Sequence, residues 1–548
     1  MREQETLVPN SPRFRQALAL ILVGVSAVSY FAAPAGAAVN ASSVAAAARA
    51  NDLVQVRQLI KSGADVNAPA ADGSTALLYA AFDSNVDMIK TLLAAGADPN
   101  VANHFAVTPL LQASRYGDEA TMEVLLKGGA DIVKAQREGE TPLMAAARTG
   151  SVPAVKLLLK HGADPNATES LWDETALMWA TAERHLDVVD ALLIAGADPN
   201  RKARVSELTK RSTRTDFPSG GFTAVMWAAR DGDEPLVRRL VQGGADLKLT
   251  NGDGASPMML AIINDRFDLA AKLLDLGADA NDGSLYQAVE MHDATTDWRA
   301  KDGTRLRADH PNKLTALDLI KVLLDHGADP NKPYEGQMHS ASMCCDTHAN
   351  GTPFFRAAVA ADVEALKLMI AKGADLEWSP KKPDVEDPAV MGLGPKHAGK
   401  RPLMVAMDGG KGVGMAGGPG DIREGAAPPF REVSNRDPLD AMQALIDAGA
   451  NVNAKTPEGD STLHIAAFAG KLDVVRLLAK NRADLSLKDG AGLTALQVVE
   501  KQSPRPPPPT SGALAGEKQG AQPTEVAALL RELMHGSVQA NLTEGRSK

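Results

Sequence analysis

The sequence predicts an all-α protein in which about twelve short two-helix repeats stack into a solenoid. The triplet Gly-Ala-Asp recurs at spacings of 33, 33, 33 and 34 residues, with its glycine at Gly63, Gly96, Gly129, Gly162 and Gly196. A second marker, Thr followed by Pro or Ala and then by Leu, comes after most of these triplets. Aromatic residues make up only 4 % of a chain that is 44 % hydrophobic, so small residues must fill a core of closely packed helices.

The fourth repeat shows why each unit is expected to form two helices. The hydroxyl of Thr141 can cap the first helix, and Pro142 suits the first helical position, where no N–H bond is lost. Leucines near Leu158 form the apolar face of the second helix, and Gly162 is placed to end it in a left-handed conformation. One such unit cannot bury its apolar face alone, so stability must come from stacking on neighbours.

Together these markers resemble the ankyrin repeat, with its period of 33 and its T-P-L-H-x-A signature. The segment 462–467 comes closest to that signature, and the resemblance covers roughly residues 43–535. The pattern is similar to that of exported bacterial ankyrin-repeat proteins with loops between repeats. It implies an ankyrin-repeat solenoid that binds a protein or peptide on its concave face, which is made by the hairpin tips and the exposed side of the first helices.

Departures from the period locate loop insertions. Residues 38–376 hold repeats one to nine, residues 377–535 hold repeats ten to twelve, and residues 536–548 read as a flexible tail. Later glycine spacings of 48, 50, 46 and 76 residues place the insertions after repeats five, seven, eight and nine. We expect them near 201–218, 293–313, 332–350, 377–399 and 411–436, with a proline-rich one near 502–523.

The N-terminal segment 1–37 reads as a secretory signal. Arg13 and Arg15 precede an apolar run, and Ala35-Gly36-Ala37 supplies small residues for cleavage. A periplasmic or secreted protein is therefore expected, without stable membrane insertion after cleavage. An uncleaved membrane anchor is the alternative, because residues 17–39 are just long enough to span a bilayer.

Composition and motifs narrow the function. A net charge of -10 argues against nucleic acid as a partner, because binding phosphates requires cations. No nucleophile-elbow, zinc-protease or phosphate-loop motif occurs, so neither an enzyme nor a cofactor is predicted. The leading hypothesis is a protein-binding scaffold, monomeric by expectation.

The resemblance also marks the residues of the expected partner-binding face. These follow the His slot of the motif or its Ala-Ala pair: Tyr79, Phe82, Arg115, Tyr116, Arg148, Trp179, Trp227 and Arg230. Tyr, Trp and Arg dominate binding hot spots, which favours a contact role. The alternative is that the aromatic side chains brace neighbouring hairpins.

Basic residues begin the first insertion although the protein is acidic. Arg201, Lys202 and Arg204 precede Lys210, Arg211 and Arg214. They form either a solvated charged loop or a positive clamp for an acidic partner.

One insertion carries a candidate metal site. Cys344, Cys345 and His348 follow His339, and thiolates with imidazoles can bind zinc or copper. A vicinal disulfide or no chemical role are the alternatives for these cysteines. This cluster supports the second hypothesis, a metal-binding or redox accessory protein.

Methionine occupies the motif His slot in five repeats: Met144, Met178, Met226, Met259 and Met404. A copper site is disfavoured because stacked helices lie about 9 Å apart, too far for neighbouring sulfurs to share an ion. We therefore expect these side chains to fill the core.

Overall fold

The computed structural model describes residues 43–136, 138–206, 219–293, 312–334, 351–381, 397–409, 437–502 and 521–544. The predicted signal segment 1–37 and most of the predicted insertions lie outside the described residues. Contacts divide the chain into a first unit, residues 1–113 with 120–131, and a second unit, residues 114–119 with 132–548.

Within the described residues, 24 helices alternate as the first and second helices of twelve repeats, which confirms the predicted all-α class. The first helices are α2 (Val44–Arg49), α4 (Ala76–Phe82), α6 (Pro109–Tyr116), α8 (Pro142–Thr149), α10 (Ala176–Ala182), α12 (Ala224–Asp231), α14 (Pro257–Ile263), α16 (Ser284–Asp293), α18 (Pro353–Val359), α20 (Pro402–Ala406), α22 (Thr462–Ala469) and α24 (Ala495–Glu500). The second helices are α3 (Leu53–Lys61), α5 (Val86–Ala94), α7 (Glu119–Lys127), α9 (Val152–Lys160), α11 (Leu186–Ile194), α13 (Glu234–Gln242), α15 (Phe267–Asp275), α17 (Ala316–Asp325), α19 (Val363–Ile370), α21 (Pro438–Asp447), α23 (Leu472–Lys480) and α25 (Pro523–Glu544).

The fourth repeat forms for the reasons read from its sequence. The Thr141 hydroxyl accepts the Met144 N–H at 3.2 Å, which caps α8, and Pro142 opens that helix. Ser151 caps α9 in the same way. Gly162 has φ +92°, the left-handed conformation expected beyond the end of the second helix.

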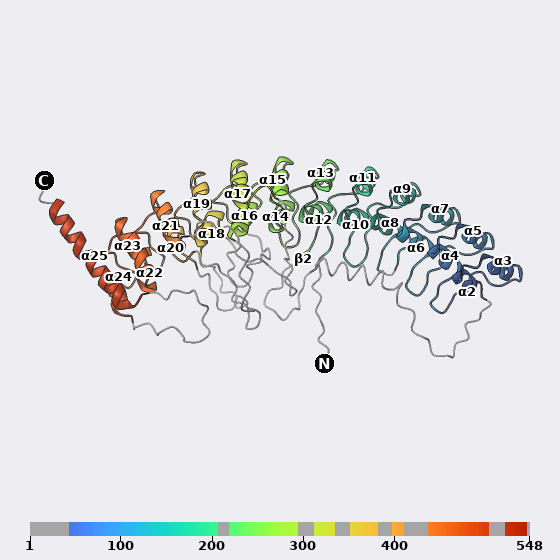
Figure 1. Ribbon diagram of the computed structural model, residues 1–548, viewed down its shortest axis with the longest axis horizontal. Helices are drawn as coiled ribbons and strands as arrows, with labels where there is room; N and C mark the ends of the chain where they lie inside the picture. Colours follow the sequence, from blue (N-terminus) through green and yellow to red (C-terminus); the bar gives the residue numbers. More distant parts are fainter. Residues whose placement is uncertain are drawn as a thin grey trace, which may run out of the picture. The chain divides into compact units, whose positions relative to one another are not determined.

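In the second unit the helices form two layers (Figure 1). Each first helix packs on the next first helix from α8 to α24. The second helices pack likewise from α9 to α13 and again from α15 to α25, and they form the upper row in the figure as far as α21. In the first unit α2 packs on α4 and α3 on α5.

Small and flexible side chains fill the space between the layers. Ala145, Ala146 and Ala147 of α8 are fully buried, which lets neighbouring helices approach closely. The five methionines in the motif His slot are at most 2 % exposed, so the expected core-filling role is confirmed.

An asparagine after the Gly-Ala-Asp turn ties each of several repeats to the next one. The Asn166 Nδ2 donates to the Gly196 carbonyl at 3.0 Å, and its Oδ1 accepts the Asp198 N–H at 2.7 Å. We call this pair of bonds the Asn clamp. The second unit repeats it at Asn200, Asn281 and Asn331, and the first unit at Asn67 and Asn100.

Hairpins between the repeats also bond to one another in the second unit. Val205 and Ser206 (β1) pair antiparallel with Ser219 and Gly220 (β2), so the segment predicted as an insertion from residue 201 begins as part of a hairpin. The Arg204 N–H donates to the Trp172 carbonyl at 2.5 Å, and the Gly252 N–H donates to the Gly220 carbonyl at 2.9 Å. The hairpins of successive repeats thus form one edge of the unit, which we call the hairpin edge, and these backbone bonds set the position of each hairpin against the next.

The last repeat packs α24 against the long helix α25. This helix runs to Glu544 and so enters residues 536–548, where a flexible tail is predicted. Beyond Gly536 the helix meets neither Gly nor Pro, the two residues that most strongly end helices. Among the described residues, none of the helices has the length and apolar character needed to span a bilayer.

Candidate functional site

In the first unit, the predicted residues Tyr79 and Phe82 lie on α4. The Tyr79 hydroxyl donates to the Asp72 carboxylate at 3.3 Å, and the Arg49 guanidinium lies 6.0 Å from the centre of the Tyr79 ring. Phe82 is 48 % exposed. Tyr79 is thus held by its neighbours, whereas Phe82 offers accessible apolar surface.

The same contacts shift both ionisable groups. Burial, followed by the negative charge of Asp72, raises the pKa of Tyr79. Burial alone would raise the pKa of Asp72, but hydrogen bonds from Ser74 and Tyr79 outweigh it and lower that pKa. Asp72 therefore stays charged and Tyr79 stays a hydrogen-bond donor at neutral pH.

In the second unit, a buried carboxylate joins two of the predicted arginines. The Arg115 Nε donates to Glu140 Oε2 at 3.2 Å, and the Arg148 Nη2 lies 3.1 Å from Glu140 Oε1. The Glu140 side chain is 3 % exposed. In the sequence Glu140 directly precedes Thr141, the residue that caps α8. The hairpin of the fourth repeat thereby positions both arginines, because their shared counter-charge cannot move freely.

Trp179 extends this arrangement into the fifth repeat. The Arg148 guanidinium lies 5.1 Å from the centre of the Trp179 ring, a cation–π contact. The Trp179 Nε1 donates to Glu174 Oε2 at 2.9 Å. Each of these side chains contacts the next, and we call the set the Arg–Trp chain: Arg115, Glu140, Arg148, Trp179 and Glu174.

Trp227 lies elsewhere, inside the sixth repeat. Trp227 is 5 % exposed. The centre of its ring lies 4.7 Å from the centre of the Phe222 ring and 4.3 Å from the Arg230 guanidinium. The Arg230 Nε in turn donates to Asp231 at 2.7 Å. Trp227 thus presents little area to solvent, whereas Tyr116 on α6 is 52 % exposed.

The three described basic residues of the predicted clamp all connect neighbouring hairpins. The Arg204 guanidinium donates from Nε and Nη2 to the two Asp173 oxygens, both at 2.9 Å, and this pairing raises the pKa of Arg204. The Lys202 Nζ donates to the Thr250 carbonyl at 2.7 Å, and Arg201 reaches the Asn166 carbonyl at 3.4 Å. All three remain exposed, while Lys210, Arg211 and Arg214 lie outside the described residues.

Sequence reasoning missed an exposed apolar group on this edge. Leu171, Trp172 and Val205 are 54 %, 47 % and 43 % exposed and occupy two adjacent hairpins, joined by the bond from Arg204 to Trp172. We call these three residues the tip patch. Its signal in the sequence was a tryptophan three residues before the Thr175 cap, a position where most other repeats place small or polar residues and the third repeat places Phe105.

A second buried carboxylate fixes the tip patch. Glu169 is 4 % exposed, and its oxygens accept the backbone N–H groups of Leu171, Trp172 and Glu174 at 2.6, 2.7 and 3.0 Å. The Ser170 N–H donates to the Glu138 carbonyl of the preceding hairpin at 2.9 Å. The tip is therefore held rigid before any partner arrives.

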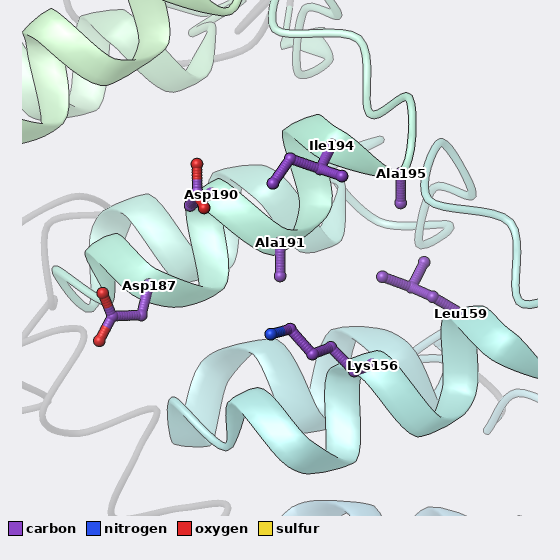
Figure 2. Close-up of a pocket in the computed structure, with 7 residues that line it drawn as sticks. All are labelled: Lys156, Leu159, Asp187, Asp190, Ala191, Ile194 and Ala195. Carbon is purple, nitrogen blue, oxygen red and sulfur yellow. The ribbon is translucent and has the colours of Figure 1, made fainter.

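A pocket of about 240 Å³ lies in the other layer, between α9 and α11 (Figure 2). Lys156 and Leu159 of α9 face Asp187, Ala191 and Ile194 of α11 there. Its lining combines charged and aliphatic side chains and includes no Ser, Cys or His nucleophile. The lining also includes Asp190, so the pocket presents one amine beside two carboxylates.

The predicted metal ligands Cys344, Cys345 and His348 lie outside the described residues. Among the described residues, no three His, Cys, Asp or Glu side chains gather in a way that could hold a metal ion.

Comparison with known families finds ankyrin-repeat models in both the N-terminal half and the C-terminal part of the chain. A family model described as ankyrin repeats (3 copies) matches residues 26–103, 43–136, 110–203 and 205–284. A second model, described as ankyrin repeats (many copies), matches residues 445–499.

Several curated proteins are similar over parts of the chain. Human B-cell lymphoma 3 protein is 26 % identical over 296 residues, which is 53 % of this chain and 50 % of that protein. The mouse B-cell lymphoma 3 protein homolog is 39 % identical over 82 residues, 15 % of this chain and 18 % of that protein. Human Notch-regulated ankyrin repeat-containing protein is 32 % identical over 74 residues, 13 % of this chain and 65 % of that protein. The chain thus spans half or less of the B-cell lymphoma relatives.

Proposed function

Because the chain belongs to the ankyrin-repeat family, we propose that it is a non-catalytic scaffold that binds a protein partner on the hairpin edge of its second unit. One observation carries the choice of surface: the exposed tip patch stands on a loop held by Glu169. An apolar group on a rigid support loses little conformational entropy when it binds.

The residue types around the tip patch also suit protein recognition. Trp and Arg are enriched among residues that dominate binding energy, especially where they are held in place. Trp172 supplies exposed aromatic area, and the half-exposed Arg204 lies beside it, fixed by Asp173. The Arg–Trp chain of repeats three to five supports the neighbouring hairpins.

The partner is proposed to be acidic near its contact region. Arg201 and Lys202 are exposed and donate to carbonyl groups, so their charges are not neutralised by carboxylates in those bonds. Such cations speed the approach of an acidic partner and make its association rate fall with salt.

We expect Trp172→Ala to weaken capture of the partner by about 2 kcal/mol, roughly a 30-fold rise in Kd, because it removes the largest exposed ring of the tip patch. The partner would be identified by affinity capture and mass spectrometry with the full chain as bait, and its Kd measured by calorimetry.

Two controls interpret that result. Phe468→Ala removes a ring that is 58 % exposed in the eleventh repeat, and it should leave Kd unchanged. A Trp179→Ala and Trp227→Ala double variant tests the aromatic residues of the sequence prediction. Equal affinity of Trp172→Ala and the unaltered protein would refute the tip patch as the docking surface.

We further propose that residues 1–37 are removed during export, so that the scaffold acts in the periplasm or outside the cell. Intact-mass and N-terminal sequencing of the protein recovered from its own cells should then show a chain that begins at Ala38. A mass that still includes residues 1–37 would favour the uncleaved anchor.

A further inference from the structure

The junction between repeats six and seven lacks the Asn clamp. Lys248 occupies the clamp position, and its ammonium group cannot accept the Asp279 N–H. Within residues 219–293, no hydrogen bond joins Lys248 to Gly277 or Asp279. The junctions on either side carry complete clamps, at Asn200 and at Asn281.

Between α9 and α25, contact between neighbouring second helices is also weakest at this junction. α11 packs on α13 and α15 packs on α17, but α13 and α15 make at most marginal contact. The preceding junction has an ion pair between its second helices, from Arg239 Nε to Asp190 Oδ1 at 2.6 Å. No ion pair or hydrogen bond joins the described helices α13 and α15.

Loss of the asparagine alone does not explain this weak contact. Glu377 replaces it between repeats nine and ten, yet its Oε1 accepts the Asn451 N–H at 2.7 Å. α19 also packs on α21 there. Among the described junctions from α9 to α25, only the one at Lys248 therefore combines both defects.

The first-helix layer stays intact at the same place. α12 packs on α14, and Met226, Met259 and Tyr286 share one buried cluster that crosses from repeat six to repeat eight. The Gly252 N–H also bonds to the Gly220 carbonyl of the adjoining hairpin. The junction is thus tied in the first-helix layer and only weakly joined in the second-helix layer.

We propose that the junction between repeats six and seven is a hinge, about which repeats four to six and seven to nine of the second unit turn as two blocks. The buried cluster between α12 and α14 is the pivot, and α13 and α15 move apart or together. Bending here costs little, because few contacts need to break in the second-helix layer.

Paired spin labels test this hinge in the full chain. With Cys344 and Cys345 replaced by Ser, labels at Arg238→Cys on α13 and Lys272→Cys on α15 report the distance across the junction. Labels at Asp187→Cys on α11 and Arg238→Cys report the clamped junction before it. We expect a broader distance distribution for the first pair than for the second.

Restoring the clamp should stiffen the hinge. Lys248→Asn supplies both an acceptor and a donor, so the α13–α15 distribution should narrow to the width of the clamped junction. Lys248→Ala removes the lysine without adding a clamp and should leave the distribution broad. Circular dichroism checks that each variant keeps its helices.

The opposite substitution at the preceding junction keeps the hinge testable if Lys248→Asn does not fold. Asn200→Lys removes a clamp at the preceding junction and should broaden the α11–α13 distribution there. Equal widths at both junctions in the unaltered chain would overturn the hinge, and so would a Lys248→Asn distribution as broad as that of Lys248→Ala. These outcomes do not depend on partner binding.

Discussion

Replacing Glu290 with alanine is expected to destabilise repeats eight and nine by about 3–5 kcal/mol, because it removes the carboxylate that acts most strongly on a buried guanidinium. The Arg356 Nη2 of α18 donates to Glu290 Oε2 of α16 at 3.0 Å, and Nε pairs with Oε1. The two side chains are only 9 % and 11 % exposed. Burial alone lowers the pKa of Arg356, but Glu290 outweighs it and raises that pKa, so the arginine keeps its charge.

Hydrogen exchange is the measurement of choice for this variant. Repeat arrays do not always unfold in one step, so a global midpoint can hide a local loss. The amides of α16 and α18 should exchange faster in Glu290→Ala, and urea unfolding followed by circular dichroism should begin at lower denaturant.

Two further variants separate burial from charge. A Glu290→Leu and Arg356→Met double variant should recover most of the stability, because a well-packed apolar pair replaces two buried charges without leaving one unpaired. Arg238→Ala breaks an exposed pair with Glu234, 44 % and 43 % exposed, and should cost only about 0.3–0.5 kcal/mol. If Glu290→Ala costs no more than Arg238→Ala, the buried pair does not stabilise the junction.

The helical part of the fold could be predicted because its signals are local. Thr141 caps the helix that follows it and Gly162 takes a left-handed conformation, and both effects depend on a few adjacent residues. Because the same markers recur in most repeats, together they predict the fold much more strongly than any one of them does.

The Asn clamp shows where local reading stopped. Asn166 follows the Gly-Ala-Asp turn, but its side chain bonds to Gly196 and Asp198 of the next repeat. Partners about thirty residues away in sequence become neighbours only through stacking. The residues adjacent to Asn166 therefore do not reveal which groups it binds.

The candidate site was predicted unevenly for the same reason. The residue slot that holds Trp179 and Trp227 was found by counting from the motif, but burial depends on what the preceding hairpin supplies. Glu174 lies before one cap and bonds to Trp179, whereas Phe222 lies before the other and packs against Trp227 with its ring tilted. Two tryptophans in equivalent positions thus differ in their surroundings.

Glu169→Ala is expected to lower the free energy of local opening at the tip patch by about 3 kcal/mol, because three backbone N–H groups lose a charged acceptor. The amides of Leu171, Trp172 and Glu174 should then exchange roughly 100-fold faster, since each 1.4 kcal/mol is a tenfold change. Glu169→Gln keeps one carbonyl oxygen as an acceptor and should give an intermediate rate.

The same variant connects rigidity with binding. Glu169 is 4 % exposed and offers a partner almost no contact, so any loss of affinity must act through the loop it holds. On the proposed function, Glu169→Ala should raise Kd towards the value of Trp172→Ala, because a mobile tip must be ordered again on binding. Faster exchange with unchanged Kd would show that the tip patch lies outside the interface, and unchanged exchange would show that Glu169 does not order it.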